Sequence, residues 1–158
     1  VILMFLYWRS YNYLFDEILN SKNEKFVFFG IASAALLFFH VLFLGMEIDN
    51  KIFKLLRKII IVLFILSEII AQFLLTINLY KNKENLKNYC NVFIINLKMF
   101  FVITIFSVSM FVIFILLFYD LSSKVDYILE WNYFAGLLFY YLLSALMWKK
   151  LTSNPASS

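Results

Sequence analysis

Four long apolar runs, each bounded by charged residues, constrain this chain more than any other feature. They cover residues 26–46, 59–80, 99–119 and 131–148. A helix that crosses about 30 Å of hydrocarbon at about 1.5 Å per residue needs about 20 apolar residues, and each run comes close to that length. The sequence therefore predicts an all-α fold, a polytopic bundle of four transmembrane helices.

The composition agrees with a membrane environment. Apolar residues make up 64% of the chain and charged residues 15%, against about 45 to 50% and about 25% in soluble domains. A soluble fold of this length buries only about 70% of its extended surface, so it would expose large apolar patches to water. We expect one membrane domain over residues 1–150 and an irregular polar tail over residues 151–158.

The first 19 residues are predicted to form a further helix of a different kind. Polar residues recur along it at steps of three and four, at Arg9, Asn12, Asp16 and Asn20. This stripe favours an amphipathic helix that lies in the membrane interface. In the alternative interpretation, residues 1–8 are the tail of a fifth span whose beginning has been cut, because the chain starts with Val1, which indicates processing or a fragment.

Two segments next to the predicted spans could lengthen them. Residues 51–58 carry their lysines on one face of a short helix, which either lies on the membrane surface or prolongs the second span into water. Residues 92–97 are apolar apart from Asn96 and are expected to extend the third helix into the headgroup layer. Lys98 is expected to mark the interface, with its side chain reaching toward water.

Polar side chains inside the predicted spans are candidate functional residues, because an ionisable group at membrane depth costs about 2.5 to 3.5 kcal/mol on insertion scales. They are Ser33 and His40 in the first span and Glu68, Gln72 and Thr76 in the second. Glu68 lies near the middle of its span, with Gln72 and Thr76 following on the same helical face. Either Glu68 binds a proton or cation with Gln72 as its hydrogen-bond donor, or a protonated Glu68 ties its helix to a neighbour. The second interpretation is favoured.

His40 is the only histidine in the chain and the only candidate for holding a cofactor. A histidine inside a helical bundle can be an axial ligand of haem, but ligation by two histidines of this chain is excluded. The favoured interpretation is a neutral imidazole that hydrogen-bonds to a neighbouring helix or to Glu68. No cofactor is predicted, and haem or quinone remains an alternative.

No catalytic or metal-binding motif is present in the sequence. A Ser-His-acid triad would have to use His40 at membrane depth without a nucleophile motif, and a glycine-rich phosphate loop is missing. Cys90 is the only cysteine, which excludes an internal disulfide, a CxxC redox pair and a zinc cluster. No catalytic residue and no metal site are predicted.

Small residues mark the places where helices are expected to approach closely. Gly30 and Ala34 form a small-xxx-small step in the first span, which allows another helix backbone to come near. Gly136 and Ser144 are predicted to do the same in the fourth span. These four residues are packing signals.

The basic residues are distributed unequally between the two sides of an antiparallel four-span bundle. One side holds 9 of the 14, namely Arg9, Lys22, Lys25, Lys81, Lys83, Lys87, Lys98, Lys149 and Lys150. The positive-inside rule then places both termini on the cytoplasmic or matrix side of a bacterial or organelle inner membrane. Because these residues lie in short loops between spans, the net charge of +4 indicates an anionic lipid surface and no nucleic-acid partner.

Together these features predict an integral membrane protein that acts as a non-enzymatic structural or accessory subunit of a larger membrane complex. Its expected partners are the lipid bilayer and other membrane protein subunits. Unbroken spans, short loops and the missing cofactor motifs favour this function over two alternatives. The first is a small ion- or proton-coupled carrier or channel that uses Glu68, and the second is a haem- or quinone-associated electron-transfer subunit that uses His40.

Overall fold

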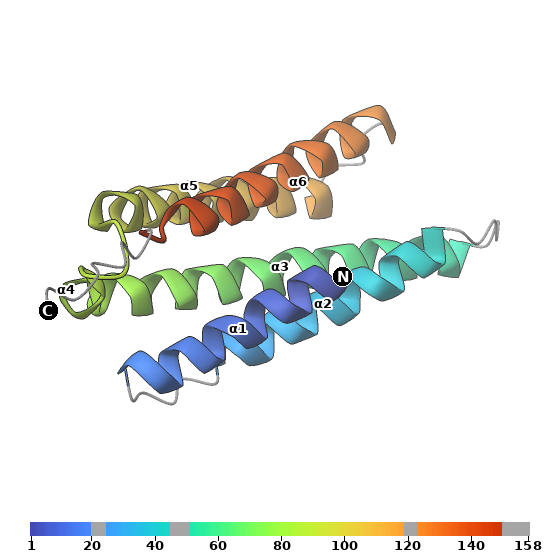
Figure 1. Cartoon of the computed structure of the whole chain (residues 1–158). Coiled ribbons are helices and arrows are strands. Elements are labelled where there is room, and N and C mark those ends of the chain that lie inside the picture. Colours follow the sequence, from blue (N-terminus) through green and yellow to red (C-terminus); the bar gives the residue numbers. More distant parts are fainter. Residues whose placement is uncertain (20–24, 45–50, 119–122, 150–158) are drawn as a thin grey trace, which may run out of the picture.

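The computed structural model describes residues 1–19, 25–44, 51–118 and 123–149, and these ranges are helical apart from short connections. The helices are α1 (Ile2–Leu19), α2 (Lys25–Leu44), α3 (Lys51–Lys81), α4 (Lys83–Leu86), α5 (Val92–Phe118) and α6 (Ser123–Leu146). Their arrangement is shown in Figure 1. The prediction of an all-α fold is confirmed.

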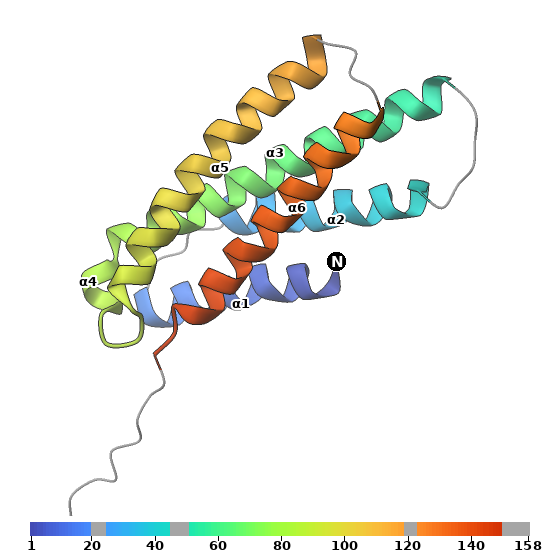
Figure 2. The ribbon, with the colours of Figure 1, turned by 90° about the horizontal axis from the view of Figure 1, so that it is seen from above.

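The long helices form two layers. In Figure 1, α5 and α6 lie above a second layer made of α1, α2 and α3. Each helix packs against its neighbour in the chain, α1 on α2, α2 on α3, and α5 on α6, while α3 also packs on α5 and joins the two layers. Figure 2 shows that α4 lies where α3 ends and α5 begins. We call this the α4 end of the bundle.

Within the described ranges, three helices are long and apolar enough to cross a membrane, over Lys25–Phe43, Lys51–Lys81 and Val92–Phe111. They correspond to the first three predicted spans. The second and third begin earlier than predicted, because the helices continue through residues 51–58 and 92–97. The lysine-bearing segment therefore prolongs the second span instead of forming a separate surface helix. Residues 45, 46 and 119 of the predicted spans lie outside the described ranges.

The predicted fourth span, residues 131–148, is not among these three helices. It falls on α6, which ends before Met147 and Trp148. Both residues leave the helix because the backbone here pairs with the segment that precedes α5. The Asn91 N–H donates to the carbonyl of Met147 at 2.8 Å, and the Lys149 N–H donates to the carbonyl of Tyr89 at 2.9 Å. These bonds fix the end of α6 to the start of α5.

The polarity of the bundle is the reverse of that of a water-soluble protein, in which ionisable side chains are almost never fully buried. Large apolar side chains are exposed on every long helix, for example Leu3, Phe28, Phe38, Leu55, Phe93, Phe100, Leu138 and Leu142. The buried polar or charged side chains of the described residues are Ser33, His40, Glu68, Gln72, Thr76, Lys98, Ser109 and Ser144. An apolar exterior around a polar interior is typical of a helical bundle in lipid.

Helix α1 lies lengthwise along α2, as both views show (Figures 1 and 2). Its Trp8, Tyr11 and Phe15 side chains are buried in the bundle, whereas Arg9 and Asp16 are exposed on the opposite face. In the predicted polar stripe, Arg9 and Asp16 therefore face away from the other helices, Asn12 is half-buried, and Asn20 lies outside the described residues. Helix α1 is not one of the three helices that meet the length and hydropathy requirements for a span, and both interpretations of it stay predictions.

Candidate functional site

Glu68 is fully buried in the middle of α3, and its carboxyl group contacts side chains from three helices. Gln72, one turn further along α3, donates from Nε2 to Oε1 at 2.9 Å. The Tyr141 hydroxyl of α6 donates to the same oxygen at 2.8 Å. The other oxygen, Oε2, is hydrogen-bonded to the Ser33 hydroxyl of α2. The carboxyl group therefore ties α2, α3 and α6 together.

The hydrogens available around Ser33 favour a protonated carboxyl group at Glu68. The Ser33 hydroxyl lies 2.8 Å from the carbonyl oxygen of Gly30 and is also bonded to Oε2 of Glu68. A serine hydroxyl has one hydrogen but two lone pairs, so it cannot donate to both oxygens. Both contacts are satisfied if Ser33 donates to Gly30 and the carboxylic acid of Glu68 donates to Ser33. A neutral acid is also the form that a low-dielectric site accommodates at lower cost.

A second hydrogen-bonded group lies one helical turn beyond Gln72 on α3. The hydroxyl groups of Thr76 and Tyr140 are 3.0 Å apart, and the Tyr140 hydroxyl also donates to the backbone carbonyl of Gln72 at 3.3 Å. Thr76 and Tyr140 are fully buried. The predicted ridge of Glu68, Gln72 and Thr76 therefore faces α6 and is met there by two consecutive tyrosines.

Lys98 of α5 is fully buried, so the prediction that its side chain reaches toward water is wrong. Its Nζ donates to the Ser144 hydroxyl at 2.8 Å and lies 4.4 Å from the ring centroid of Tyr140. The helix begins well before Lys98, and the side chain points into the bundle, where a tyrosine face stabilises the cation. Asn96, two residues earlier, is exposed.

Ser144 links Lys98 to α1. Its hydroxyl lies 2.8 Å from the Tyr7 hydroxyl and donates to the Tyr140 carbonyl at 2.9 Å. Because its one hydrogen goes to that carbonyl, Ser144 accepts from both Lys98 and Tyr7. The Tyr7 ring also meets the Tyr141 ring edge to face, with centroids 4.6 Å apart. The Lys98 and Glu68 groups are thus joined through neighbouring tyrosines, and no ion pair connects them in the described part of the chain.

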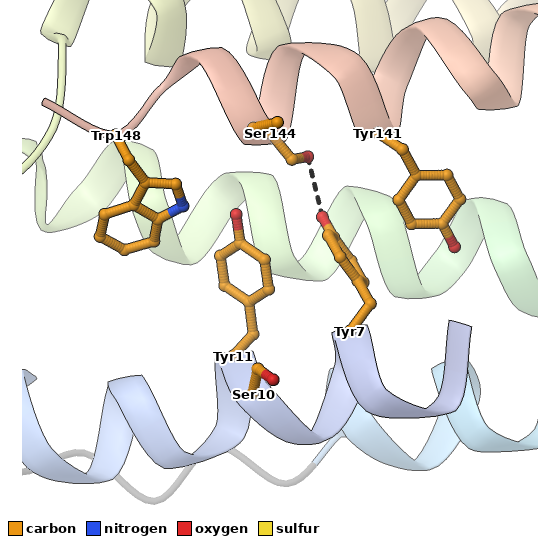
Figure 3. Close-up of a pocket in the computed structure, with 7 residues that line it drawn as sticks. Tyr7, Ser10, Tyr11, Tyr141, Ser144 and Trp148 are labelled. Carbon is orange, nitrogen blue, oxygen red and sulfur yellow. Dashed lines mark hydrogen bonds between the residues drawn. The ribbon is translucent and has the colours of Figure 1, made fainter. Parts of the chain in front are cut away.

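A pocket of about 290 Å³ opens between α1 and α6 next to this group. It is lined by Tyr7, Ser10, Tyr11, Tyr141, Ser144, Ala145 and Trp148. Figure 3 shows Tyr7 and Tyr11 extending from α1 toward α6, with the Tyr11 hydroxyl directed between Ser144 and Trp148. Most of the lining residues are aromatic, and the polar side-chain atoms among them are hydroxyl oxygens and the indole nitrogen of Trp148.

The predicted cofactor candidate His40 lies apart from both groups. It is buried on α2, yet its Nδ1 has no hydrogen-bond partner among the described residues. The positive charge of Arg57, near the start of α3, interacts electrostatically with the imidazole of His40. The predicted hydrogen bond between His40 and Glu68 is absent here, because the Glu68 carboxyl is bonded to Ser33, Gln72 and Tyr141.

The predicted packing residues have different surroundings. Gly30 lies directly beneath the indole ring of Trp8, so a side chain at this position would overlap the ring. Ala34 is buried in a cluster with Phe64. Gly136 has more room, because an added Cβ would meet Cδ1 of Ile105 at 3.5 Å. Ser144, predicted as a packing residue, is a hydrogen-bonding residue as well.

Sequence reasoning missed the contribution of Lys98 and of the tyrosines. The charge of Lys98 predicts a helix boundary, although apolar residues precede it. Tyr140 and Tyr141 lie inside the fourth predicted span, whereas tyrosine in spans is enriched at the water interface. Tyrosines away from an interface are a signal for internal hydrogen bonds, and they could have indicated a partner for Glu68.

The thiol of Cys90, just before α5, is buried, and burial raises its pKa to about 11, against about 8.5 for an unperturbed cysteine. Since the thiolate is the reactive form, we expect alkylation by a maleimide at pH 8 to be more than about a hundredfold slower than in the chain unfolded in detergent. The rate should rise about tenfold per pH unit up to pH 10. Equal rates for the folded and unfolded chain would contradict the burial.

Comparisons of the chain with protein-family models, with curated proteins and with solved structures find no match. The buried polar groups and the pocket beside them are therefore the basis for a functional assignment.

Proposed function

We propose that the chain is an accessory subunit of a larger membrane protein complex, with α6 as its fourth span and both termini on the cytoplasmic or matrix side. The observation that supports a membrane protein best is the reversed polarity of the bundle, in which Glu68 and Lys98 are fully buried while large apolar side chains cover the outside. Water would penalise both features, and a bilayer requires the second.

The surface and packing of α6 support its assignment as a span. Leu138 is 70% exposed, and Phe139, Leu142 and Leu146 on the same helix are also exposed. Such a row of apolar side chains is unfavourable in water. Because α6 packs against α5, which meets the length and hydropathy requirements for a span, its residues would lie at the same depth in the bilayer.

The hydrogen bonding of Glu68 supports a structural role. Both carboxyl oxygens have side-chain partners from α2, α3 and α6, so the group is used to hold helices together. Polar side chains that bond across helices are a usual means of association in lipid, where the hydrophobic effect does not drive helices together. A non-enzymatic subunit needs such a rigid bundle and an apolar exterior on which neighbouring subunits pack.

Purification from the native membrane in mild detergent tests this function. We expect the chain of 18.8 kDa to migrate as part of a larger species that contains other membrane proteins. A photo-crosslinking residue at the exposed Phe100 of α5 should form discrete adducts with such a protein, whereas one at the buried Leu75 should react only within the chain. A detergent-stable monomer with lipid adducts alone would contradict the proposal.

The topology is tested with single cysteines in a Cys90→Ser variant. Asn85 and Lys149 are exposed at the α4 end, and Lys51 and Trp131 are exposed in the opposite part of the bundle. An impermeant maleimide should label cysteines at Asn85 and Lys149 from the cytoplasmic or matrix side, and cysteines at Lys51 and Trp131 from the other side. If positions 131 and 149 were labelled from the same side, α6 would not be a span.

A second function, a small proton-coupled carrier, is favoured by two buried ionisable groups. The geometry around Ser33 favours a proton on Glu68, and Lys98 lies in the same bundle without an acidic partner among the described residues. An intramembrane carboxyl group that holds a proton is a common part of proton-coupled transport. The accessory role ranks first because the Glu68 carboxyl is already fully hydrogen-bonded.

A further inference from the structure

We propose that the pocket between α1 and α6 binds an anionic amphiphile, with the oxyanion head group between Tyr11, Ser144 and Trp148 and the acyl chain along the outside of α1 and α6. This binding site goes beyond the proposed accessory role. It depends only on the part of that role which places α1 and α6 in contact with the bilayer.

An unpartnered hydroxyl group points into this pocket. Tyr11 is 5% exposed, and its hydroxyl has no hydrogen-bond partner among the described residues. Figure 3 shows this hydroxyl directed toward α6 between Ser144 and Trp148. A buried hydroxyl without a partner is costly, and an oxyanion in the pocket would accept its hydrogen.

The neighbouring groups also have more donors than acceptors. The Lys98 ammonium group has three hydrogens, and one of them is donated to Ser144. Its other contacts are the ring faces of Tyr140 and Tyr11, at 4.4 and 5.8 Å from the centroids. No acidic side chain contacts Lys98 in the described part of the chain. The buried cation therefore lacks a counter-ion, which an anionic ligand beside Ser144 would supply.

The charges around the opening agree with an anionic head group. Arg9 lines an adjoining pocket that shares Ser10 with this one, and the exposed Lys149 follows the lining residue Trp148 in the chain. Among the described residues, no acidic one lines either pocket. The acidic side chains of α1, Asp16 and Glu17, lie more than one turn beyond Tyr11 and are exposed.

The walls of the pocket indicate why the anion is attached to an acyl chain. Aromatic rings line it, from Tyr7, Tyr11, Tyr141 and Trp148. The side chains of Leu6, which lines the adjoining pocket, and of Leu142, next to Tyr141 in α6, are exposed. A free inorganic ion would leave these apolar surfaces uncovered. A carboxylate or phosphate head on an acyl chain matches both the unpartnered Tyr11 hydroxyl and the apolar surroundings. The shared chemistry is an oxyanion, from either a free fatty acid or an anionic phospholipid.

Quenching of Trp148 fluorescence by brominated lipids tests the proposal in vesicles of zwitterionic phosphatidylcholine. A Trp131→Phe variant keeps the buried Trp8 and the pocket residue Trp148, and a further Trp148→Phe substitution identifies the signal from the pocket. The probes are dibromostearic acid, dibromo-phosphatidylglycerol and dibromo-phosphatidylcholine. We expect one of the anionic probes to quench Trp148 at a mole fraction at least about tenfold lower than the zwitterionic probe, which also identifies the source of the head group.

Two substitutions show whether the named groups bind the anion. Tyr11→Phe removes only the unpartnered hydroxyl and should weaken binding of the anionic probe about tenfold, whereas Tyr80→Phe at the exposed end of α3 should leave it unchanged. Lys98→Met should abolish the preference for the anionic over the zwitterionic probe. Equal quenching by all three probes, or unchanged binding in Tyr11→Phe, would overturn the proposal. Quenching by the zwitterionic probe reports contact with the bilayer independently, so loss of the site is distinguishable from loss of insertion.

Discussion

Replacement of Glu68 by alanine is expected to lower the free energy of unfolding by about 3 kcal/mol, whereas replacement by glutamine is expected to change it by less than about 1 kcal/mol. Alanine leaves the Gln72 amide, the Tyr141 hydroxyl and the Ser33 hydroxyl without their shared partner. It also leaves a cavity among three helices. Each hydrogen bond between membrane helices contributes only about 0.6 kcal/mol on average, so the cavity supplies much of the loss.

Glutamine preserves this arrangement only if Glu68 is protonated in the folded protein. An amide has one carbonyl oxygen, which can accept from Gln72 and Tyr141, and one NH2 group, which can donate to Ser33. A protonated carboxyl group has the same pattern of donors and acceptors. An ionised carboxylate could only accept, so Ser33 would have to donate its hydrogen to it. Replacing that carboxylate by an amide would then bring the amide NH2 group against the Ser33 hydroxyl, with two donors facing each other and no acceptor between them.

Thermal or denaturant unfolding of the purified protein in mild detergent measures both variants, with Glu84→Ala as the control. Glu84 is an exposed acid on α4, so its removal should change the free energy of unfolding by no more than about 0.5 kcal/mol. A Glu68→Gln variant as unstable as Glu68→Ala would contradict the protonated form.

The same glutamine variant distinguishes the two proposed functions. Glutamine keeps the hydrogen bonds but cannot release a proton in the physiological range. A structural Glu68 therefore predicts that Glu68→Gln assembles with its partners at wild-type levels. A proton-coupled carrier predicts that flux in proteoliposomes is lost although the variant folds normally. Wild-type flux in this variant would exclude the carrier function.

The helices were predictable from the sequence because each depends on a local property. A run of about 20 apolar residues specifies a spanning helix wherever it lies in the chain, so the first three runs correspond to helices of the required length and hydropathy. The boundaries were less predictable. A lysine such as Lys98 predicts the end of a span, yet its side chain is buried against Ser144 and Tyr140.

The partners of the buried polar residues could not be predicted in the same way. The spacing of Glu68, Gln72 and Thr76 places them on one helical face, but the sequence does not show which helix that face meets. Tyr141 lies 73 positions from its partner Glu68, and Tyr7 lies 137 positions from its partner Ser144. Contacts over such distances in the chain depend on how the helices are arranged, and no local pattern encodes that arrangement.

Gly30→Ala is expected to destabilise the protein by about 2 kcal/mol, although alanine is the better helix former. The indole ring of Trp8 lies so close to Gly30 that an added methyl group would overlap its Cγ and Cδ2 atoms. Trp8 is fully buried, so the ring cannot move aside without displacing α1 from α2. The matched control is Gly136→Ala on α6, where a Cβ would meet Cδ1 of Ile105 at an ordinary 3.5 Å.

The sign of the effect should reverse when the tryptophan is removed. Alanine in a helix interior is favoured over glycine by up to about 1 kcal/mol, and in wild type this gain is outweighed by the overlap with Trp8. In a Trp8→Ala variant every overlapping side-chain atom, Cγ included, is absent, so a further Gly30→Ala change should be neutral or stabilising, as Gly136→Ala should be in wild type. Unfolding measurements on the two single variants and the double variant give this coupling directly. If Gly30→Ala cost the same free energy with and without Trp8, α1 would not be packed on α2 through this pair, and the pocket that α1 forms with α6 would lose its support.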